Sequence, residues 1–167
     1  FKIQLLAGSI LLLGAVSCTK NLDKFPASDI ELSQSFQTVK DAKTWNTGLY
    51  SNLRGRVGGI YTFTTDVQAD QLNASLDFGN RNGSPHRWEG FLADDYSIRD
   101  IWSGYYRPIP NANISINGFN QITPSTPAET TELNRYKGDA HLVRAYYYHQ
   151  LVKLYAKSYN PATAGTD

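Results

Sequence analysis

The chain contains one cysteine, Cys18, and no methionine. A single thiol cannot form a disulfide within the chain, and it cannot supply the several thiolates of a structural zinc site. Charge of neither sign dominates, because 16 Lys and Arg residues stand against 15 Asp and Glu residues and give a formal net charge of +1. A nearly neutral chain lacks the basic surface that attracts phosphate backbones, so we expect no nucleic-acid partner.

Motifs of catalysis and metal binding are also scarce. The three histidines lack the spacing of metal ligands, and no serine lies in a nucleophile-elbow pattern. Gly58-Gly59 lacks the Gly-Lys-Ser/Thr ending of a phosphate loop, which favours a simple turn. Asp94 and Asp95 could be paired carboxylates of a glycosidase or oxygen ligands of calcium, but adjacent acids before Ile98 more simply suit the positive end of a helix. We predict no enzyme, no cofactor and no metal site.

An apolar run ends directly before the cysteine. Residues 8–17 close in the small residues Ala15-Val16-Ser17, and Lys2 precedes them, which is typical of an export signal. The run is shorter than the about 20 apolar residues that span a bilayer. We predict that residues 1–17 are a lipoprotein signal peptide and that Cys18 is the lipid attachment site, although Ala15 stands where such signals usually carry Leu. The alternative is an ordinary signal peptide that precedes a cysteine.

The remaining chain has the length of one domain. Residues 18–35 are polar, include Pro26 and show no helical period, so we predict a tether that follows the acylated cysteine. The folded domain is expected to begin near Phe36 and to occupy residues 36–167. The chain also has 11 tyrosines and three tryptophans, most of which must pack in the core.

Hydrophobic periodicity predicts a first helix that begins at Thr38 and ends near Gly55. Thr38 and Asp41 have the spacing of a capping box, and apolar residues then recur at steps of three and four. From Gly55 to Tyr96 this period disappears and Gly, Asn, Asp and Ser dominate. A long irregular loop is therefore predicted there, with one short helix around residues 65–72.

A second helical stripe covers residues 98–119 and is interrupted by Pro108. Proline removes a backbone donor and clashes one turn back, so we predict two helices in near phase with Pro108 opening the second. Residues 121–131 are predicted to be a loop. A last helix is expected from residue 131 or 132 to Lys157, apolar over more than half of its girth, with a solvated stripe that includes Asp139. Its two apolar sets are Leu133, Tyr136, Ala140, Val143, Tyr147, Leu151 and Leu154, and Ala145, Tyr148, Val152 and Tyr155.

Arg144 falls between apolar positions of the last helix. A buried charge without a partner is costly, so we expect Arg144 to be buried and paired, with Asp66 and Asp70 as candidate partners. The alternative is an arginine that lies over tyrosine faces with its guanidinium in water.

Four segments resemble the amino-terminal part of the SusD/RagB family of surface lipoproteins. Residues 18–26 contain a cysteine followed by Leu-Asp and a proline, and residues 42–53 resemble the first helix of the family, with its Gly-Leu-Tyr cluster. Residues 102–113 are similar to a Trp, Tyr, Ile, Ala-Asn pattern. The most specific segment is 137–155, which resembles a Gly-Glu-Ala, Leu-Arg-Ala-Tyr-Tyr-Tyr, Leu-Val signature, with Asp139 in place of Glu.

This resemblance implies an all-α fold of tetratricopeptide-like helical pairs with long irregular loops, of which residues 36–167 are an amino-terminal part. It implies a non-catalytic lipoprotein of the outer membrane, lipid-anchored and facing the cell exterior. Such a protein captures oligosaccharides and passes them to a partner SusC-like TonB-dependent transporter. The alternatives are a protein that binds peptides, a scaffold without a small ligand, or a lipid-anchored glycosidase.

The long loop holds the candidate ligand residues. Trp88 lies away from any periodic stripe and is a candidate for stacking on a sugar, although it could equally plug the loop onto the helices. Arg81, Asn80 and Asn82 could donate hydrogen bonds to sugar hydroxyls, but glycine-rich loops of this kind are more often turns. Trp45 and Trp102 lie on core stripes and are not expected to contact ligand.

Overall fold

The computed structural model describes residues 31–90 and 92–162, and the chain divides into two compact units, Phe1–Ser35 and Phe36–Asp167. The described part of the first unit holds the 3₁₀ helix η2 (Leu32–Gln34), which is followed by a hydrogen bond from Ser35 Oγ to the carbonyl of Glu31 at 3.0 Å. Cys18, the predicted signal peptide and most of the predicted tether lie outside the described residues. They stay predictions.

The second unit is built from helices alone over its described residues, which confirms the all-α prediction. Among the described helices, none is long and apolar enough to cross a membrane. The elements in chain order are α2 (Val39–Arg54), α3 (Ile60–Gln68), η3 (Leu76–Phe78), α4 (Gly83–Arg87), α5 (Tyr96–Tyr106), α6 (Ile109–Phe119) and α7 (Pro127–Tyr155).

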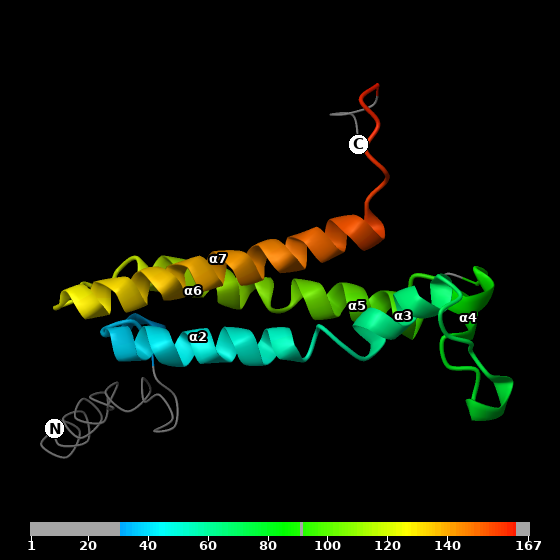
Figure 1. Cartoon of the computed structure of the whole chain (residues 1–167), viewed down its shortest axis with the longest axis horizontal. Helices are drawn as coiled ribbons and strands as arrows, with labels where there is room; N and C mark the ends of the chain where they lie inside the picture. Colours follow the sequence, from blue (N-terminus) through cyan, green and yellow to red (C-terminus); the bar gives the residue numbers. More distant parts are fainter. Residues whose placement is uncertain (1–30, 91, 163–167) are drawn as a thin grey trace, which may run out of the picture. The chain divides into compact units, whose positions relative to one another are not determined.

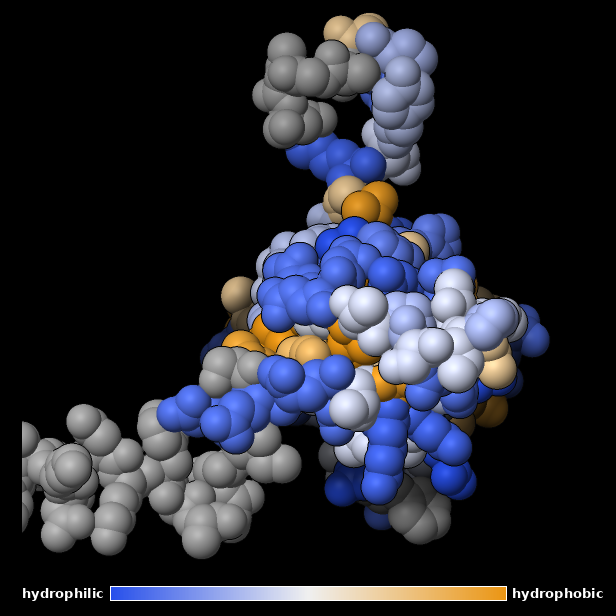
Figure 2. Space-filling model, turned by 90° about the vertical axis from the view of Figure 1, so that its left-hand side faces the viewer, coloured by the Kyte–Doolittle hydropathy of each residue, from blue (hydrophilic) through white to orange (hydrophobic). Residues whose placement is uncertain are grey.

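Three rods form the body of this unit: α2, α5 together with α6, and α7 (Figure 1). α5 and α6 follow each other almost in line and run back along α2 and α7, while α3 and α4 lie beyond the end of α2 (Figure 1). α6 packs on both α2 and α7, and the apolar faces of the three rods form one core. Seen from the end where α7 begins, hydrophilic residues cover most of the visible surface and apolar residues show only in small patches among them (Figure 2).

The first helix begins as its sequence predicts. The Asp41 backbone N–H donates to Thr38 Oγ1 at 3.2 Å, and the Thr38 N–H donates to Asp41 Oδ2 at 2.8 Å. This reciprocal pair is a capping box, which satisfies two backbone donors that a helix start leaves open.

The predicted break at Pro108 is also confirmed. α5 ends at Tyr106, Pro108 is the N-cap of α6, and Pro110 lies in the first turn of α6. A proline there lacks only a backbone N–H that has no partner within the helix, so both prolines are tolerated.

The last helix begins earlier than predicted. α7 starts at Pro127 because Thr126 caps it, accepting the Glu129 N–H at 3.2 Å, and Pro127 occupies the tolerated first turn. The two prolines of the 121–131 segment indicated a loop, whereas Pro127 opens a helix. α7 ends at Tyr155, two residues before the predicted Lys157.

The segment 55–96 is less irregular than expected. It contains α3, η3 and α4, and α3 begins at Ile60 rather than near residue 65. The turn predicted at Gly58-Gly59 is present, since Gly59 has φ of +61° and precedes α3 as its N-cap. Periodicity missed these elements because helices of nine and five residues are too short to show a clear stripe.

One burial prediction was wrong, and one apolar face of α7 stays uncovered by the described residues. Trp102 is 43% exposed and packs at the surface against Tyr106 and Tyr155, with ring centroids 4.5 and 4.9 Å away. The buried face of α5 is instead Ser97, Ile101, Gly104 and Tyr105. On α7 the first apolar set is buried through Leu151, but Tyr148 and Val152 of the second set are 46% and 62% exposed, so α7 is covered on one side only within this unit.

Arg144 does not pair with Asp66 or Asp70. Its Nη1 donates to Asn113 Oδ1 of α6 at 3.0 Å, and its Nη2 lies 3.4 Å from His141 Nδ1. Asp66 lies in α3 and Asp70 in the turn after it, and α3 packs on α4 and α5, whereas Arg144 lies where α7 packs on α6. An amide partner suits a half-buried guanidinium that still reaches water.

Candidate ligand-binding site

A hollow of about 540 Å³ opens between α3, the turn before α4 and the start of α5. Its size falls in the range of small-molecule sites, about 300–1,000 Å³. Three short segments that are separate in sequence form its wall. Its lining residues are Gly59, Ile60, Phe63, Arg81, Asn82 and Tyr96.

Two aromatic rings line this hollow. Phe63 lies on α3 and is 51% exposed, and Tyr96 is the first residue of α5 and is 38% exposed. The Tyr96 hydroxyl accepts the Asn82 backbone N–H at 2.8 Å and donates to Asn82 Oδ1 at 3.0 Å. Because this hydroxyl is engaged at both its donor and an acceptor position, the ring of Tyr96 is held in one orientation.

Polar groups lie beside the rings. Asn82 has φ of +59°, a left-handed conformation that asparagine tolerates better than most residues, and it precedes α4 as its N-cap. Arg81 is exposed and makes no ion pair with the described residues. The hollow therefore combines apolar ring faces with amide and guanidinium groups that form hydrogen bonds.

Only two of the four loop residues predicted to bind ligand lie at the hollow. Arg81 and Asn82 line the hollow, but Asn80 and Trp88 do not. Asn80 Oδ1 accepts from Arg87 Nη1 at 3.2 Å, and the Asn80 side chain fills the space where a Cβ at Gly83 would lie, so Asn80 stabilises its own loop.

Trp88 ties its loop to a helix, which is one of its two predicted roles, and its ring stays exposed. Its Nε1–H donates to the Gln68 carbonyl at the end of α3 at 3.0 Å, which ties the loop to a helix, yet the residue remains 65% exposed. Its φ of +54° is unusual for a bulky residue. The indole is thus fixed at the surface, on α3 but outside the hollow.

Sequence reasoning missed Phe63 and Tyr96. Phe63 belongs to a helix that the periodicity placed too late in the chain, and Tyr96 stood at the edge of the predicted loop. A large aromatic on an exposed helix position was the available signal, but it could not be recognised before the bounds of α3 were known.

Two carboxylates of this region, Asp95 and Glu89, make structural contacts, whereas Asp94 is exposed. Asp95 caps α5, accepting the Ser97 N–H at 2.8 Å and the Ser97 hydroxyl. Glu89 forms an ion pair with Arg87 at 2.7 Å. Within residues 31–90 and 92–162, no group of three His, Cys, Asp or Glu residues could hold a metal ion.

The described residues thus form an all-α scaffold with an open hollow lined by two rings, an amide and a guanidinium. The chain belongs to the SusD-like family described as "Starch-binding associating with outer membrane", because the family model matches residues 20–167. This finding confirms the resemblance noted in the sequence. Comparison with curated proteins and comparison with solved structures each found no match.

Proposed function

We propose that this chain captures oligosaccharides at the cell surface and passes them to a partner SusC-like TonB-dependent transporter of the outer membrane. The proposed binding of oligosaccharides rests on the hollow, where Phe63 and Tyr96 lie beside Asn82 and Arg81. A sugar has C–H faces that pack on aromatic rings and hydroxyls that bond to amide and guanidinium groups. The printed description of the family, starch-binding and associating with the outer membrane, supports the same ligand class and location.

The proposal includes a lipid anchor on Cys18, which holds the protein on the outer membrane with its ligand face toward the exterior. The apolar run before Cys18 and the outer-membrane association of the family support this anchor. Several acyl chains on one residue give stable attachment, whereas a single chain binds a membrane only marginally.

Calorimetric titration of the full chain with a set of oligosaccharides, including maltoheptaose, tests the binding half. We expect Phe63→Ala and Tyr96→Ala each to weaken binding about tenfold, which corresponds to ~1.4 kcal/mol. Tyr159→Ala is the matched control, because Tyr159 is an 82% exposed aromatic that does not line the hollow. Equal affinity in all three variants would place the binding site elsewhere, and no binding to any oligosaccharide would reject the ligand class.

The same samples discriminate the other functions. Chromatography of the sugars after incubation is expected to show unchanged chain lengths, and shortened products would instead indicate a glycosidase. Peptide binding in the absence of sugar binding would favour a peptide receptor. Co-purification of the transporter with the tagged full chain from native membranes tests the transfer step, and co-purification without any measurable ligand would favour a scaffold.

A further inference from the structure

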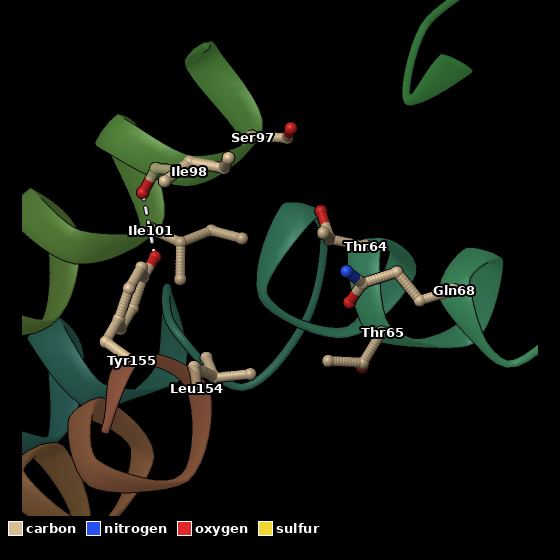
Figure 3. A pocket seen from close by; sticks show the side chains of 8 residues that line it. All are labelled: Thr64, Thr65, Gln68, Ser97, Ile98, Ile101, Leu154 and Tyr155. Carbon is tan, nitrogen blue, oxygen red and sulfur yellow. Dashed lines mark hydrogen bonds between the residues drawn. The ribbon is translucent and has the colours of Figure 1, made fainter. Parts of the chain in front are cut away.

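The helix α3 lies between two hollows. Ile60 and Phe63 of α3 line the first hollow, at the candidate ligand site. A second hollow, of about 250 Å³, separates another face of α3, at Thr65 and Gln68, from α5 and α7 (Figure 3). The far wall of the second hollow consists of Ser97, Ile98, Ile101, Leu154 and Tyr155. Two faces of α3 therefore lack the close packing of a helix in a core, whereas α6 packs on both α2 and α7.

The sequence of α3 gives this helix little stability of its own. Five of its nine residues are β-branched and two are aromatic, and both kinds lose side-chain freedom in a helix. Its N-cap is Gly59, and no described side chain caps its first turn. Isolated helices shorter than about 12–15 residues are only marginally stable in water. The structure of α3 therefore depends on its contacts with other elements.

The link from α2 to α3 leaves room for movement. Arg56 is fixed at the end of α2, since its Nη1 donates to the Asn52 carbonyl at 2.7 Å and its Nε donates to the Gly104 carbonyl of α5. Gly58 and Gly59 follow, and a Cβ at either position would meet no described atom within 4 Å. A short segment with open space around two glycines thus joins α3 to a fixed point.

α3 is held differently at its two ends. Near its start, the Tyr61 ring packs on the buried Tyr105 ring of α5, with the ring centroids 4.9 Å apart. At its end, the Gln68 carbonyl accepts the Trp88 indole N–H at 3.0 Å in an exposed hydrogen bond. Trp88 makes this bond from a left-handed backbone conformation with φ of +54°, which costs free energy for a bulky residue. The start of α3 is therefore anchored in the core, and its end is held at the surface by a strained residue.

We propose that α3 is a lid over the first hollow, and that it turns about Tyr61 when the hydrogen bond between Trp88 and Gln68 breaks. Opening withdraws Phe63 from the wall at Tyr96, which stays fixed on α5. A ligand that contacts Phe63 binds the closed form better and so holds α3 in place. The lid role rests on the proposed ligand site, whereas the opening of α3 can be measured without any ligand.

Amide hydrogen exchange of the full chain measures this opening. After correction for intrinsic rates, we expect the amide protons of α3 to exchange about a hundredfold faster than those of α6. Low concentrations of urea should accelerate exchange in α6 and hardly change it in α3, because a local opening exposes little surface. Equal protection of α3 and α6 would overturn the proposal.

Two substitutions should change the exchange of α3 in opposite directions. Trp88→Phe keeps an aromatic ring but loses the N–H, so we expect exchange about fivefold faster. Thr65→Leu adds apolar volume at the second hollow and suits a helix better, so we expect exchange about tenfold slower. Trp102→Phe on α5 and Thr47→Leu on α2 are the matched controls and should leave it unchanged, because neither residue lines either hollow. Unchanged exchange in both Trp88→Phe and Thr65→Leu would also overturn the proposal.

Maltoheptaose separates the lid role from the opening itself. Sugar that binds in calorimetry is expected to slow exchange in α3 of the parent chain, and binding without slower exchange would overturn the lid role. If no sugar binds, the proposed function is rejected, and the ligand-free exchange rates still decide whether α3 opens.

Discussion

Asn46 of α2 donates its side-chain amide to Asp139 Oδ2 of α7 at 2.9 Å. The Tyr50 hydroxyl, one turn further along α2, donates to the other carboxylate oxygen at 2.9 Å. One carboxylate on α7 thus holds two successive turns of α2, and it raises the pKa of Tyr50, chiefly through this hydrogen bond. Asp139 was predicted to lie on the solvated stripe of its helix, so this contact between helices corrects that prediction.

Removal of the Asp139 carboxylate is expected to destabilise the packing of α2 on α7. Asp139→Ala leaves the amide of Asn46, which is 8% exposed, without its acceptor, so we expect a loss of about 1–3 kcal/mol in the free energy of unfolding. Urea denaturation measures this loss. Asp94→Ala, at an exposed carboxylate, is the control and should change stability by no more than about 0.5 kcal/mol. Equal stability of both variants would show that the contact contributes nothing.

Two glycines on the helices differ in how closely other side chains pack against them. A Cβ at Gly118 would overlap the ring of Phe36, whereas a Cβ at Gly48 would meet no atom within 4 Å. We expect Gly118→Ala to lower the free energy of unfolding by about 1–3 kcal/mol, because a packed ring must move. Gly48→Ala should raise it by about 0.5–1 kcal/mol, because alanine is the better helix former. Denaturant unfolding measures both, and a change of the same sign in both would contradict this packing.

The structure also predicts how stability falls in alkali. Burial raises the pKa of Tyr155 to about 12, from an ordinary value of 10. A raised pKa in the folded state means that folding favours the neutral phenol. This contribution is complete below pH 10 and is lost as the pH rises from 10 toward 12. Thermal melts across this range are expected to show a steep fall for the parent chain and a shallower one for Tyr155→Phe.

Tyr159→Phe is the control for this pH effect. Its ring is 82% exposed, so the variant should follow the parent curve. At neutral pH, Tyr155→Phe is expected to be less stable by about 1 kcal/mol, because it loses the hydrogen bond to the Ile98 carbonyl. An identical alkaline slope in the parent and in Tyr155→Phe would show that Tyr155 does not carry the effect.

Elements defined by local rules could be predicted from the sequence. The capping box of Thr38 and Asp41, the apolar period of α2 and the break at Pro108 all depend on residues within a few positions of each other. The core face of α7 through Leu151 follows from the same period. The local sequence was enough to predict a feature wherever the interacting residues lie on the same helix.

Contacts between elements could not be predicted in this way. Arg144 pairs with Asn113 rather than with an aspartate because α7 packs on α6, and nothing local to Arg144 specifies which helix faces it. The hollow joins Phe63, Asn82 and Tyr96 from three separate segments, and of these residues only Asn82, in a glycine-rich loop, was predicted to bind ligand. Family resemblance indicated the ligand class, but only the packing of α3 beside α5 indicates where a ligand can lie.

The proposed location of the protein depends on acylation of Cys18, which can be measured directly. Expression of the full-length protein in a native-like host with a fatty-acid analogue is expected to label the parent chain and not Cys18→Ala, because only the thiol at this position can accept the diacylglyceryl group. Protease added to whole cells should then digest the labelled protein. Ser17→Ala, which keeps a small residue before the cysteine, is the control and should remain labelled. Equal labelling of the Cys18→Ala variant would reject Cys18 as the anchor, and labelling with protection from protease would place the protein on the inner side of the outer membrane, where it could not capture external oligosaccharides.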